Sequence, residues 1–227
     1  MEPARSASTA CSRHTGAIPF RQQGERLAFG AGRICALPRE EAGALVCAGY
    51  AGRYGADVRD HLMPCLLGLR DGDDRLAGVF GLRTGGERFY LEHYLSQPLN
   101  ETIAAIDGRA PTEGELVELG NLVGRRPGML RALVRALAPE LDRSGCRWLA
   151  CTATRELRIG LARAGADCRV LGPARADRLP AGDAGQWGSY YAHDPAVVLI
   201  GIRGTVQKLR HLERARAGNR RPGAIAG

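Results

Sequence analysis

Residues 115–166 read ELVELGNLVGRRPGMLRALVRALAPELDRSGCRWLACTATRELRIGLARAGA, and this stretch decides the fold. Its first apolar run, Leu116 to Val123, predicts a buried strand. Apolar side chains then recur at helical spacing and form one face of a predicted helix: Leu130, Leu133, Val134, Leu137 and Leu141. A second apolar run, Cys146 to Ala153, predicts another strand.

Two signals mark the ends of the helices in this stretch. Ser144-Gly145 ends the first helix, because glycine is favoured just after a helix C-terminus. Thr154 is a typical N-cap and predicts a second helix, whose buried face carries Leu157, Leu161 and Ala164. Because a helix lies between the two strands, the pattern predicts that the strands run parallel.

A glycine-containing loop from Gly124 to Gly128 joins the first strand to its helix. Free backbone N–H groups and the positive end of the helix dipole make such a loop a site for phosphate. Arg125 and Arg126 add donors that suit phosphate. The same residues also fit an ordinary connection with solvated arginines, because short Gly/Pro loops are common before helices.

The segment Arg125-Arg126-Pro127-Gly128-Met129-Leu130 resembles the Arg/Gln-x-x-Gly-x-Gly/Ala loop of GNAT acyltransferases, which holds the pyrophosphate of coenzyme A. It departs at the last position, where Leu130 replaces a small residue. The resemblance implies that the acyl donor is coenzyme A or acyl-phosphopantetheine, and that no metal takes part. It implies that the donor is bound by Val123, Arg125, Arg126, Gly128, Met129, Leu130 and Thr154.

Four motifs together resemble a narrower group, the thermostable hemolysin family: 89–95 (FYLEHYL, followed by Pro98), 118–122 (ELGNL), 152–154 (TAT) and 187–191 (WGSYY, followed by Pro195 and Gly201). The resemblance covers roughly residues 25–203. That family is GNAT-like in fold and related in shape to the acyl-homoserine-lactone synthases. The resemblance implies an α/β (α+β) fold in three layers, with a mixed, mostly antiparallel sheet and helices on both faces.

The rest of the chain fits that order of elements. The predicted elements outside 115–166 are a strand at 25–34, a helix at 38–54, an antiparallel hairpin at 65–69 and 76–82, a short helix at 100–106, a strand at 168–171, a closing antiparallel pair at 187–191 and 196–202, and a basic helix at 205–217. We expect a flexible segment at 1–24, the GNAT-like domain at 25–203 and a basic helical tail at 204–227.

Glu118 and Asn121 are the predicted centre of the chemistry. Side chains alternate along a strand, so a bulge at Gly120 is needed to turn both to one side. The resemblance then makes Glu118 the general base and Asn121 the residue that orients the acceptor or the thioester. A carboxylate among apolar neighbours has a raised pKa, which suits a base that acts on an amine. The alternative is that Glu118 forms a structural ion pair with an arginine.

The general acid is harder to assign. Many GNAT enzymes use a tyrosine on the helix after the fifth strand, and Leu161 stands at that position here. Tyr190, Tyr191, Ser189 and His193 are the candidate substitutes, although His193, in a His-Asp-Pro turn, is more typical of a surface turn. Of these, Tyr190 and Ser189 are the predicted substitutes. Tyr190 and Tyr191 should face opposite ways if their segment is a strand. The aromatic segment 89–95 either lines the acceptor or acyl pocket or covers one end of the sheet.

Composition points to a globular chain of 227 residues with 44% hydrophobic residues and a formal net charge of +8. A basic surface suits acyl-CoA or an acidic acyl carrier protein.

Seven cysteines, an odd count without close spacing, favour free thiols. No signal peptide and no long apolar run are present, so we expect a cytoplasmic protein without a transmembrane segment. Motifs of serine hydrolases, zinc sites and Walker ATPases are absent.

The leading functional hypothesis is therefore an acyltransferase that moves an acyl group from coenzyme A or an acyl carrier protein to a small amine. The alternative is a membrane-active hemolysin that binds the lipid surface through the amphipathic helix at 129–143. A nucleic-acid-binding role for 208–221 is disfavoured, because that basic segment has no interleaved aromatic residues.

Overall fold

The computed structural model describes residues 32–85 and 88–218. The flexible segment predicted at 1–24, the first part of the strand predicted from Glu25 and the chain after residue 218 lie outside the described residues.

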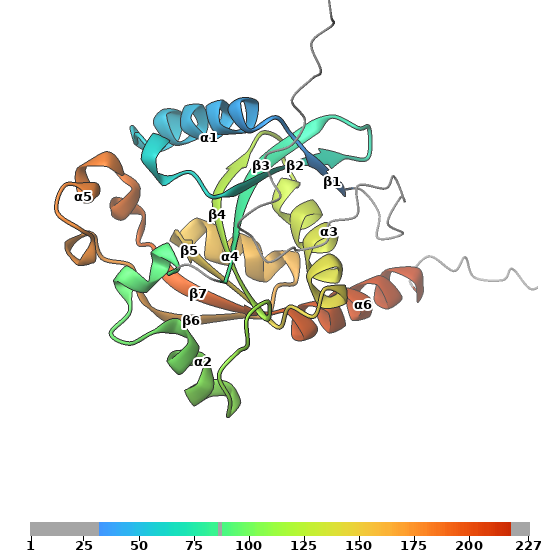
Figure 1. Ribbon diagram of the computed structural model, residues 1–227. Helices are drawn as coiled ribbons and strands as arrows, with labels where there is room; N and C mark the ends of the chain where they lie inside the picture. The colour runs from blue at the N-terminus through green and yellow to red at the C-terminus, as the bar shows by residue number, and fades with distance from the viewer. Residues whose placement is uncertain (1–31, 86–87, 219–227) are drawn as a thin grey trace, which may run out of the picture.

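Seven strands form one sheet in the order β1-β2-β3-β4-β5-β7-β6 (Figure 1). Every neighbouring pair in the described chain is antiparallel except β4 and β5, which run parallel. The predicted parallel pair and the mostly antiparallel sheet are therefore confirmed. The strands are β1 (Gly32–Ala36), β2 (Cys65–Asp71), β3 (Leu76–Thr84), β4 (Leu116–Gly124), β5 (Trp148–Ala153), β6 (Cys168–Pro173) and β7 (Ala196–Gly201).

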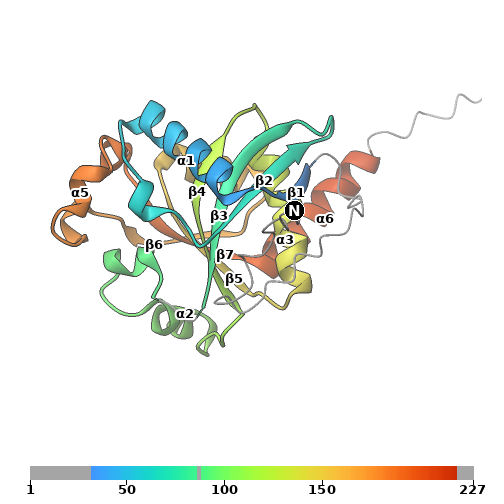
Figure 2. The ribbon, with the colours of Figure 1, turned by 45° about the horizontal axis from the view of Figure 1, so that its top comes forward.

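Helices cover both faces of the sheet, which confirms the predicted three-layer GNAT-like fold (Figures 1 and 2). Helices α3, α4 and α6 pack on one face, and α1, α2 and the short helix η2 pack on the other. The α-helices are α1 (Arg39–Tyr54), α2 (Leu99–Asp107), α3 (Met129–Arg143), α4 (Arg155–Ala164), the four-residue α5 (Asp183–Gln186) and α6 (Ile202–Gly218). The short 3₁₀ helices are η1 (Arg59–His61), η2 (Tyr90–Tyr94), η3 (Ala176–Arg178) and η4 (Tyr190–His193).

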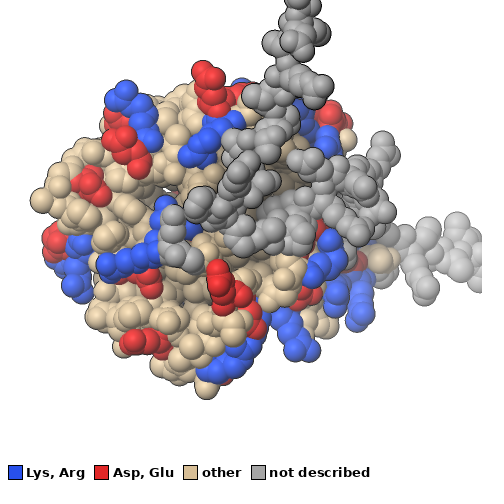
Figure 3. All heavy atoms as spheres, in the orientation of Figure 1, with Lys and Arg blue, Asp and Glu red and all other residues tan. Residues whose placement is uncertain are grey.

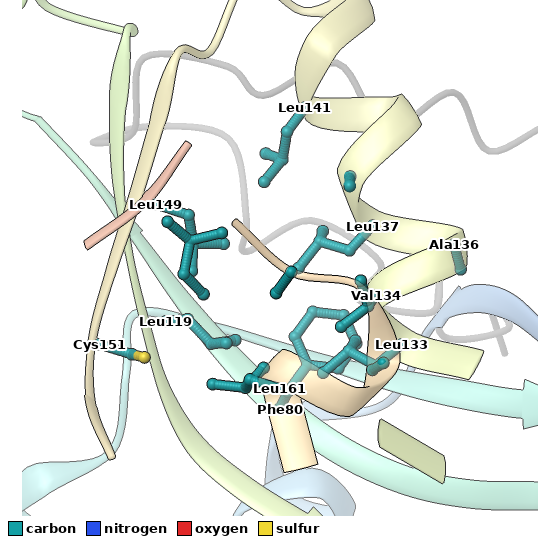
Figure 4. Packing of buried hydrophobic residues seen from close by; sticks show 14 of the residues in the cluster. Phe80, Leu119, Leu133, Val134, Ala136, Leu137, Leu141, Leu149, Cys151 and Leu161 are labelled. Atoms are coloured by element: carbon teal, nitrogen blue, oxygen red, sulfur yellow. The ribbon is translucent and has the colours of Figure 1, made fainter. Parts of the chain in front are cut away.

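The apolar face of α3 forms the centre of the core. Leu133, Leu137 and Leu141 point from α3 toward Leu119 of β4 and Leu149 of β5 (Figure 4). All five side chains are buried. Burying each leucine stabilises the fold by roughly 1.5–3 kcal/mol, so this one helix holds the parallel pair in place.

The predicted cap of α4 is confirmed, because Thr154 Oγ1 accepts a hydrogen bond from the backbone N–H of Leu157 at 3.3 Å. Helix α6 begins directly after β7 and packs against α3. Val206 and Leu209 of α6 are buried in the same core as α3. The first turns of the segment predicted as a tail therefore pack with the domain.

Of the two strands predicted to form the closing pair, the one at 187–191 is wrong. Residues 187–191 are not a strand; they follow α5 and lead into η4. Gly188 has φ +51°, a left-handed conformation that breaks an extended segment. The backbone N–H of Ser189 instead donates to Tyr54 O of α1 at 2.8 Å. The strand that does pair with β7 on its outer side is β6.

Buried thiols give a test of the core. Cys146 and Cys151 are buried, and burial raises the pKa of each thiol to about 12. Because the thiolate is the reactive form, we expect iodoacetamide to leave both cysteines unmodified in the native protein at neutral pH. In denaturant without a reducing agent, all seven cysteines of the chain should be alkylated. Peptide mass spectrometry measures both; rapid native labelling of Cys151 would contradict the packing described.

Candidate active site

The two parallel strands separate part-way along their length. Pairing between β4 and β5 ends at Leu119 and Cys151. On its other side β4 pairs Gly120 with Gly81 and Val123 with Val79, so β4 carries one extra residue there, a β-bulge. The bulge predicted at Gly120 is thus confirmed, although the residue with the left-handed conformation is Asn121, with φ +48°.

Beyond Leu119 the facing edges of β4 and β5 are not paired with each other, and a gap opens between them. A cavity of about 40 Å³ lies in this gap. Leu119, Gly120 and Leu122 border it from β4, and Cys151 and Thr152 border it from β5. Two larger cavities adjoin this gap cavity.

The first, which we call the loop groove, has a volume of about 1030 Å³ and lies between α1, the β4–α3 loop and α4. Six of the seven residues predicted to bind the donor border it: Val123, Arg126, Gly128, Met129, Leu130 and Thr154. Arg125 does not; its backbone N–H donates to Ala77 O at 2.8 Å and so extends the ladder with β3.

The loop groove has the features of an anion site. Gly128 caps α3 with φ +81° and has no side chain to cover the helix N-terminus. No side chain of the described residues caps the first helical turn, although the Met129 N–H donates to Arg126 O at 3.3 Å, and this turn carries the positive end of the helix dipole. Arg126 borders the groove, with its Nε 3.8 Å from Asp71 Oδ2, and Arg163 adds positive charge, whereas Arg53 is paired with Glu156, which also borders the groove.

The second cavity, which we call the Glu118 pocket, has a volume of about 100 Å³. It brings together three of the four predicted catalytic residues: Glu118, Asn121 and Tyr190. Ser189 does not border it. Ser189 is exposed, and its Oγ donates to Tyr54 O at 3.2 Å, which holds the chain after α5 against α1.

Glu118 is only 3% exposed. Its carboxylate accepts hydrogen bonds from the backbone N–H groups of Tyr90 at 3.1 Å and Leu91 at 3.0 Å, and Arg83 Nε lies 3.8 Å away. Burial raises the pKa of the Glu118 carboxyl above its usual range, while these three neighbours oppose the rise. The predicted buried carboxylate and the alternative ion pair with an arginine are thus both present in the geometry.

Asn121 holds the wall of the pocket. Its Oδ1 accepts from Met63 N at 2.6 Å, and its Nδ2 donates to His61 O at 3.2 Å. These bonds fix the backbone between η1 and β2 against the bulge. Its predicted role toward an acceptor stays a prediction.

Tyr190 is buried, and its hydroxyl donates to Thr152 O at 3.1 Å. Burial raises the pKa of this phenol well above its usual range, so the hydroxyl stays protonated and donates to Thr152 O. Among the other rings that line the pocket, His61, Tyr90 and Trp187 pack together with centroids 5.2–5.9 Å apart. Tyr90 and Leu91 show that segment 89–95 both lines the pocket and packs on the sheet.

Sequence reasoning missed Tyr50 and Tyr54 of α1 and His61 after it, all of which border these cavities. Tyr50 lies in the helix predicted at 38–54, and no role was predicted for its side chain. The pair at i and i+4 was the available signal, because it places two phenols on one face.

Comparison with known proteins agrees with this architecture. A sequence model of the thermostable hemolysin family matches residues 35–206, which is more than half of the chain. The chain belongs to the thermostable hemolysin family. No curated protein sequence matches it.

Members of the GNAT-like synthases are similar in structure. FeeM, an N-acyl amino acid synthase from uncultured soil microbes, matches with a TM-score of 0.51 and 14% identity over 78% of this chain and 92% of that chain. The acyl-homoserine lactone synthase LasI matches with a TM-score of 0.47 and 16% identity over 75% and 89% of the two chains. At 14% identity the likeness to FeeM shows a shared fold and nothing more.

The family name raises the question of membranes. Within residues 32–85 and 88–218, no helix combines the length and the apolar character that crossing a bilayer requires. The same residues contain no group of three or more His, Cys, Asp or Glu side chains placed to hold a metal ion.

The raised pKa of Glu118 predicts a pH-dependent effect on stability. A carboxyl with a raised pKa in the folded state contributes stability below its unfolded-state pKa near 4.5, and this contribution is lost as pH rises through the folded-state pKa. Glu118→Gln cannot ionise. Relative to wild type, this variant should therefore gain stability as pH rises above about 4.5, measured by urea unfolding across the pH range.

Glu115, the residue just before β4, provides a control, because its pKa is shifted in the opposite direction. Arg109 lowers the pKa of the Glu115 carboxyl to about 2. Glu115→Gln should be less stable than wild type at neutral pH, and the difference should vanish as pH falls through that pKa. The same pH trend in both variants would contradict the assigned environment of Glu118.

Proposed function

We propose that the chain is an N-acyltransferase that moves an acyl group from the thioester of coenzyme A, or of an acyl carrier protein, to a small amine. One observation carries the proposal. The loop groove and the Glu118 pocket lie on two sides of the gap between β4 and β5. A donor in the groove and an amine in the pocket would therefore meet at the gap.

The donor fits the groove by its chemistry. Its phosphates suit the uncapped N-terminus of α3 and the guanidinium of Arg126. From there an extended pantetheine arm, which contains two amides, can follow the unpaired edge of β4. This path leads the thioester to the gap beside Leu119 and Gly120.

The acceptor fits the Glu118 pocket. Aromatic faces attract an ammonium group, and the carboxylate of Glu118 attracts it further and takes a proton from it. The free amine nitrogen then attacks the thioester carbonyl carbon. The C–N bond forms and the C–S bond breaks. The second proton that the nitrogen loses goes to the departing thiolate, so that the products are an amide and a thiol.

Arg83 narrows the choice of acceptor. It borders the same pocket, and its buried Nε makes no hydrogen bond within the described residues. A guanidinium next to a carboxylate can hold both ends of a zwitterion. FeeM, which shares the fold, is an N-acyl amino acid synthase. We therefore propose α-amino acids as the first acceptors to test.

The choice of donor follows from the surface charge. On the face seen in Figure 3, basic and acidic side chains are interspersed, so the net charge of +8 is not gathered there. An acidic carrier protein requires a basic docking patch, whereas free coenzyme A requires only the groove. Acyl-CoA is accordingly the first donor to test.

The membrane-active alternative relied on the apolar face of 129–143. In the structure that face, which includes Leu133, Leu137 and Leu141, packs against the sheet and is buried. No observation on the described residues favours lipid binding by this helix.

Donor binding gives the first test. Arg126→Ala should weaken octanoyl-CoA binding by roughly ten- to hundredfold, because a charge-assisted hydrogen bond contributes about 1.5–3 kcal/mol. Arg125→Ala should weaken it less, since Arg125 does not border the groove. Calorimetry at two salt concentrations measures both effects, and affinity should fall with salt. If wild type binds neither octanoyl-CoA nor an octanoylated carrier protein, the proposed function fails.

Turnover gives the second test. Glu118→Gln should lower kcat/KM by about 10²–10⁴-fold, the usual contribution of a general base, while octanoyl-CoA still binds. Wild-type kcat/KM should rise with pH through the raised pKa of Glu118, because the base must be ionised. Thiol release from octanoyl-CoA in the presence of each amino acid measures the rate. Full activity of Glu118→Gln would remove Glu118 from the mechanism.

A further inference from the structure

Tyr50 occupies a special position among the described residues. It is the only residue that borders both the loop groove and the Glu118 pocket, and it also borders the gap cavity. An acyl group that passes from a donor in the groove through the gap cavity to an acceptor in the pocket would pass cavities that Tyr50 borders throughout.

The approach of α1 to the bulge explains this position. Gly49 faces Val123 of β4 so closely that an added Cβ would lie 2.5 Å from Val123 Cγ1. The missing side chain lets α1 lie directly over the separated strands, and Tyr50 follows in the next position. Its ring packs against Trp187, 6.1 Å between centroids, and against Tyr54, 5.7 Å between centroids.

The hydroxyl of Tyr50 is available for a ligand. The other phenols of the Glu118 pocket are engaged: Tyr190 with Thr152 O, Tyr94 with Tyr191, and Tyr90 with Asp183. Within the described residues the neighbour of the Tyr50 hydroxyl is the backbone amide of Leu122, on the bulged part of β4. Burial raises the pKa of Tyr50, so the phenol keeps its proton at neutral pH.

We propose that the Tyr50 hydroxyl donates a hydrogen bond to the thioester carbonyl oxygen while that oxygen becomes the oxyanion of the tetrahedral intermediate. The proposal rests on the proposed acyl transfer. It supplies a donor at the reacting centre, whereas Leu161 of α4, the position of the usual tyrosine, is buried in the core. Tyr50 keeps its proton throughout; Glu118 accepts one proton of the ammonium group, and the thiolate takes up the second proton that the nitrogen loses.

The test is Tyr50→Phe, which removes one oxygen atom and keeps the ring. We expect kcat for thiol release from octanoyl-CoA to fall by about 10²–10³-fold, as for other lost oxyanion donors, with donor affinity unchanged. Tyr191→Phe is the matched control. It also removes a phenolic hydroxyl, one that bonds the Tyr94 hydroxyl at 2.7 Å and borders none of the three cavities, so kcat should fall far less than in Tyr50→Phe.

A second readout needs no acceptor. The carbonyl stretch of octanoyl-CoA labelled with ¹³C at the thioester should shift to lower frequency on binding to wild type, because a hydrogen bond weakens the C=O bond. Tyr50→Phe should lose this shift, and Tyr191→Phe should keep it. An unchanged shift and unchanged kcat in Tyr50→Phe would overturn the role of Tyr50 while leaving acyl transfer in place. Failure of wild type to bind octanoyl-CoA or octanoylated carrier protein would overturn both.

Discussion

The whole site depends on one irregularity of the backbone, the bulge in β4. The extra residue between Gly120 and Val123 turns the edge of β4 away from β5, so that their pairing ends at Leu119. The gap that results is the place where the loop groove and the Glu118 pocket approach each other. A regular strand would continue the ladder and separate the two cavities, whatever side chains lined them.

The bulge is held by side chains from distant parts of the chain. Asn121 tolerates the left-handed conformation better than most residues, and its amide bonds the backbone at His61 and Met63. An added Cβ at Gly120 would lie 2.3 Å from Met63 Cε, so the Met63 side chain would have to move. These contacts make the bulge, the segment before β2 and the wall of the pocket one unit. They also exclude water from the Glu118 carboxyl, which is why the pKa of that carboxyl is raised.

The part of the fold that could be predicted depended on local signals. The spacing of leucines in α3, the cap at Thr154 and the apolar runs of β4 and β5 all act between near neighbours in the chain. The prediction failed at 187–191, where aromatic residues were taken for a strand. Those rings are buried by packing against α1 and each other, and an aromatic cluster has the same composition in either case.

The sequence by itself determined the strand–loop–helix unit that contains Glu118, Asn121 and the loop at 124–128, because the residues of that unit select their conformation within a few positions of each other. Only the tertiary structure decided that Arg126 borders the groove while Arg125 does not, that Ser189 lies outside the pocket, and that Tyr50 borders both the loop groove and the Glu118 pocket. These outcomes depend on how α1 packs across β4, and the energy of that contact comes from residues far apart in the chain.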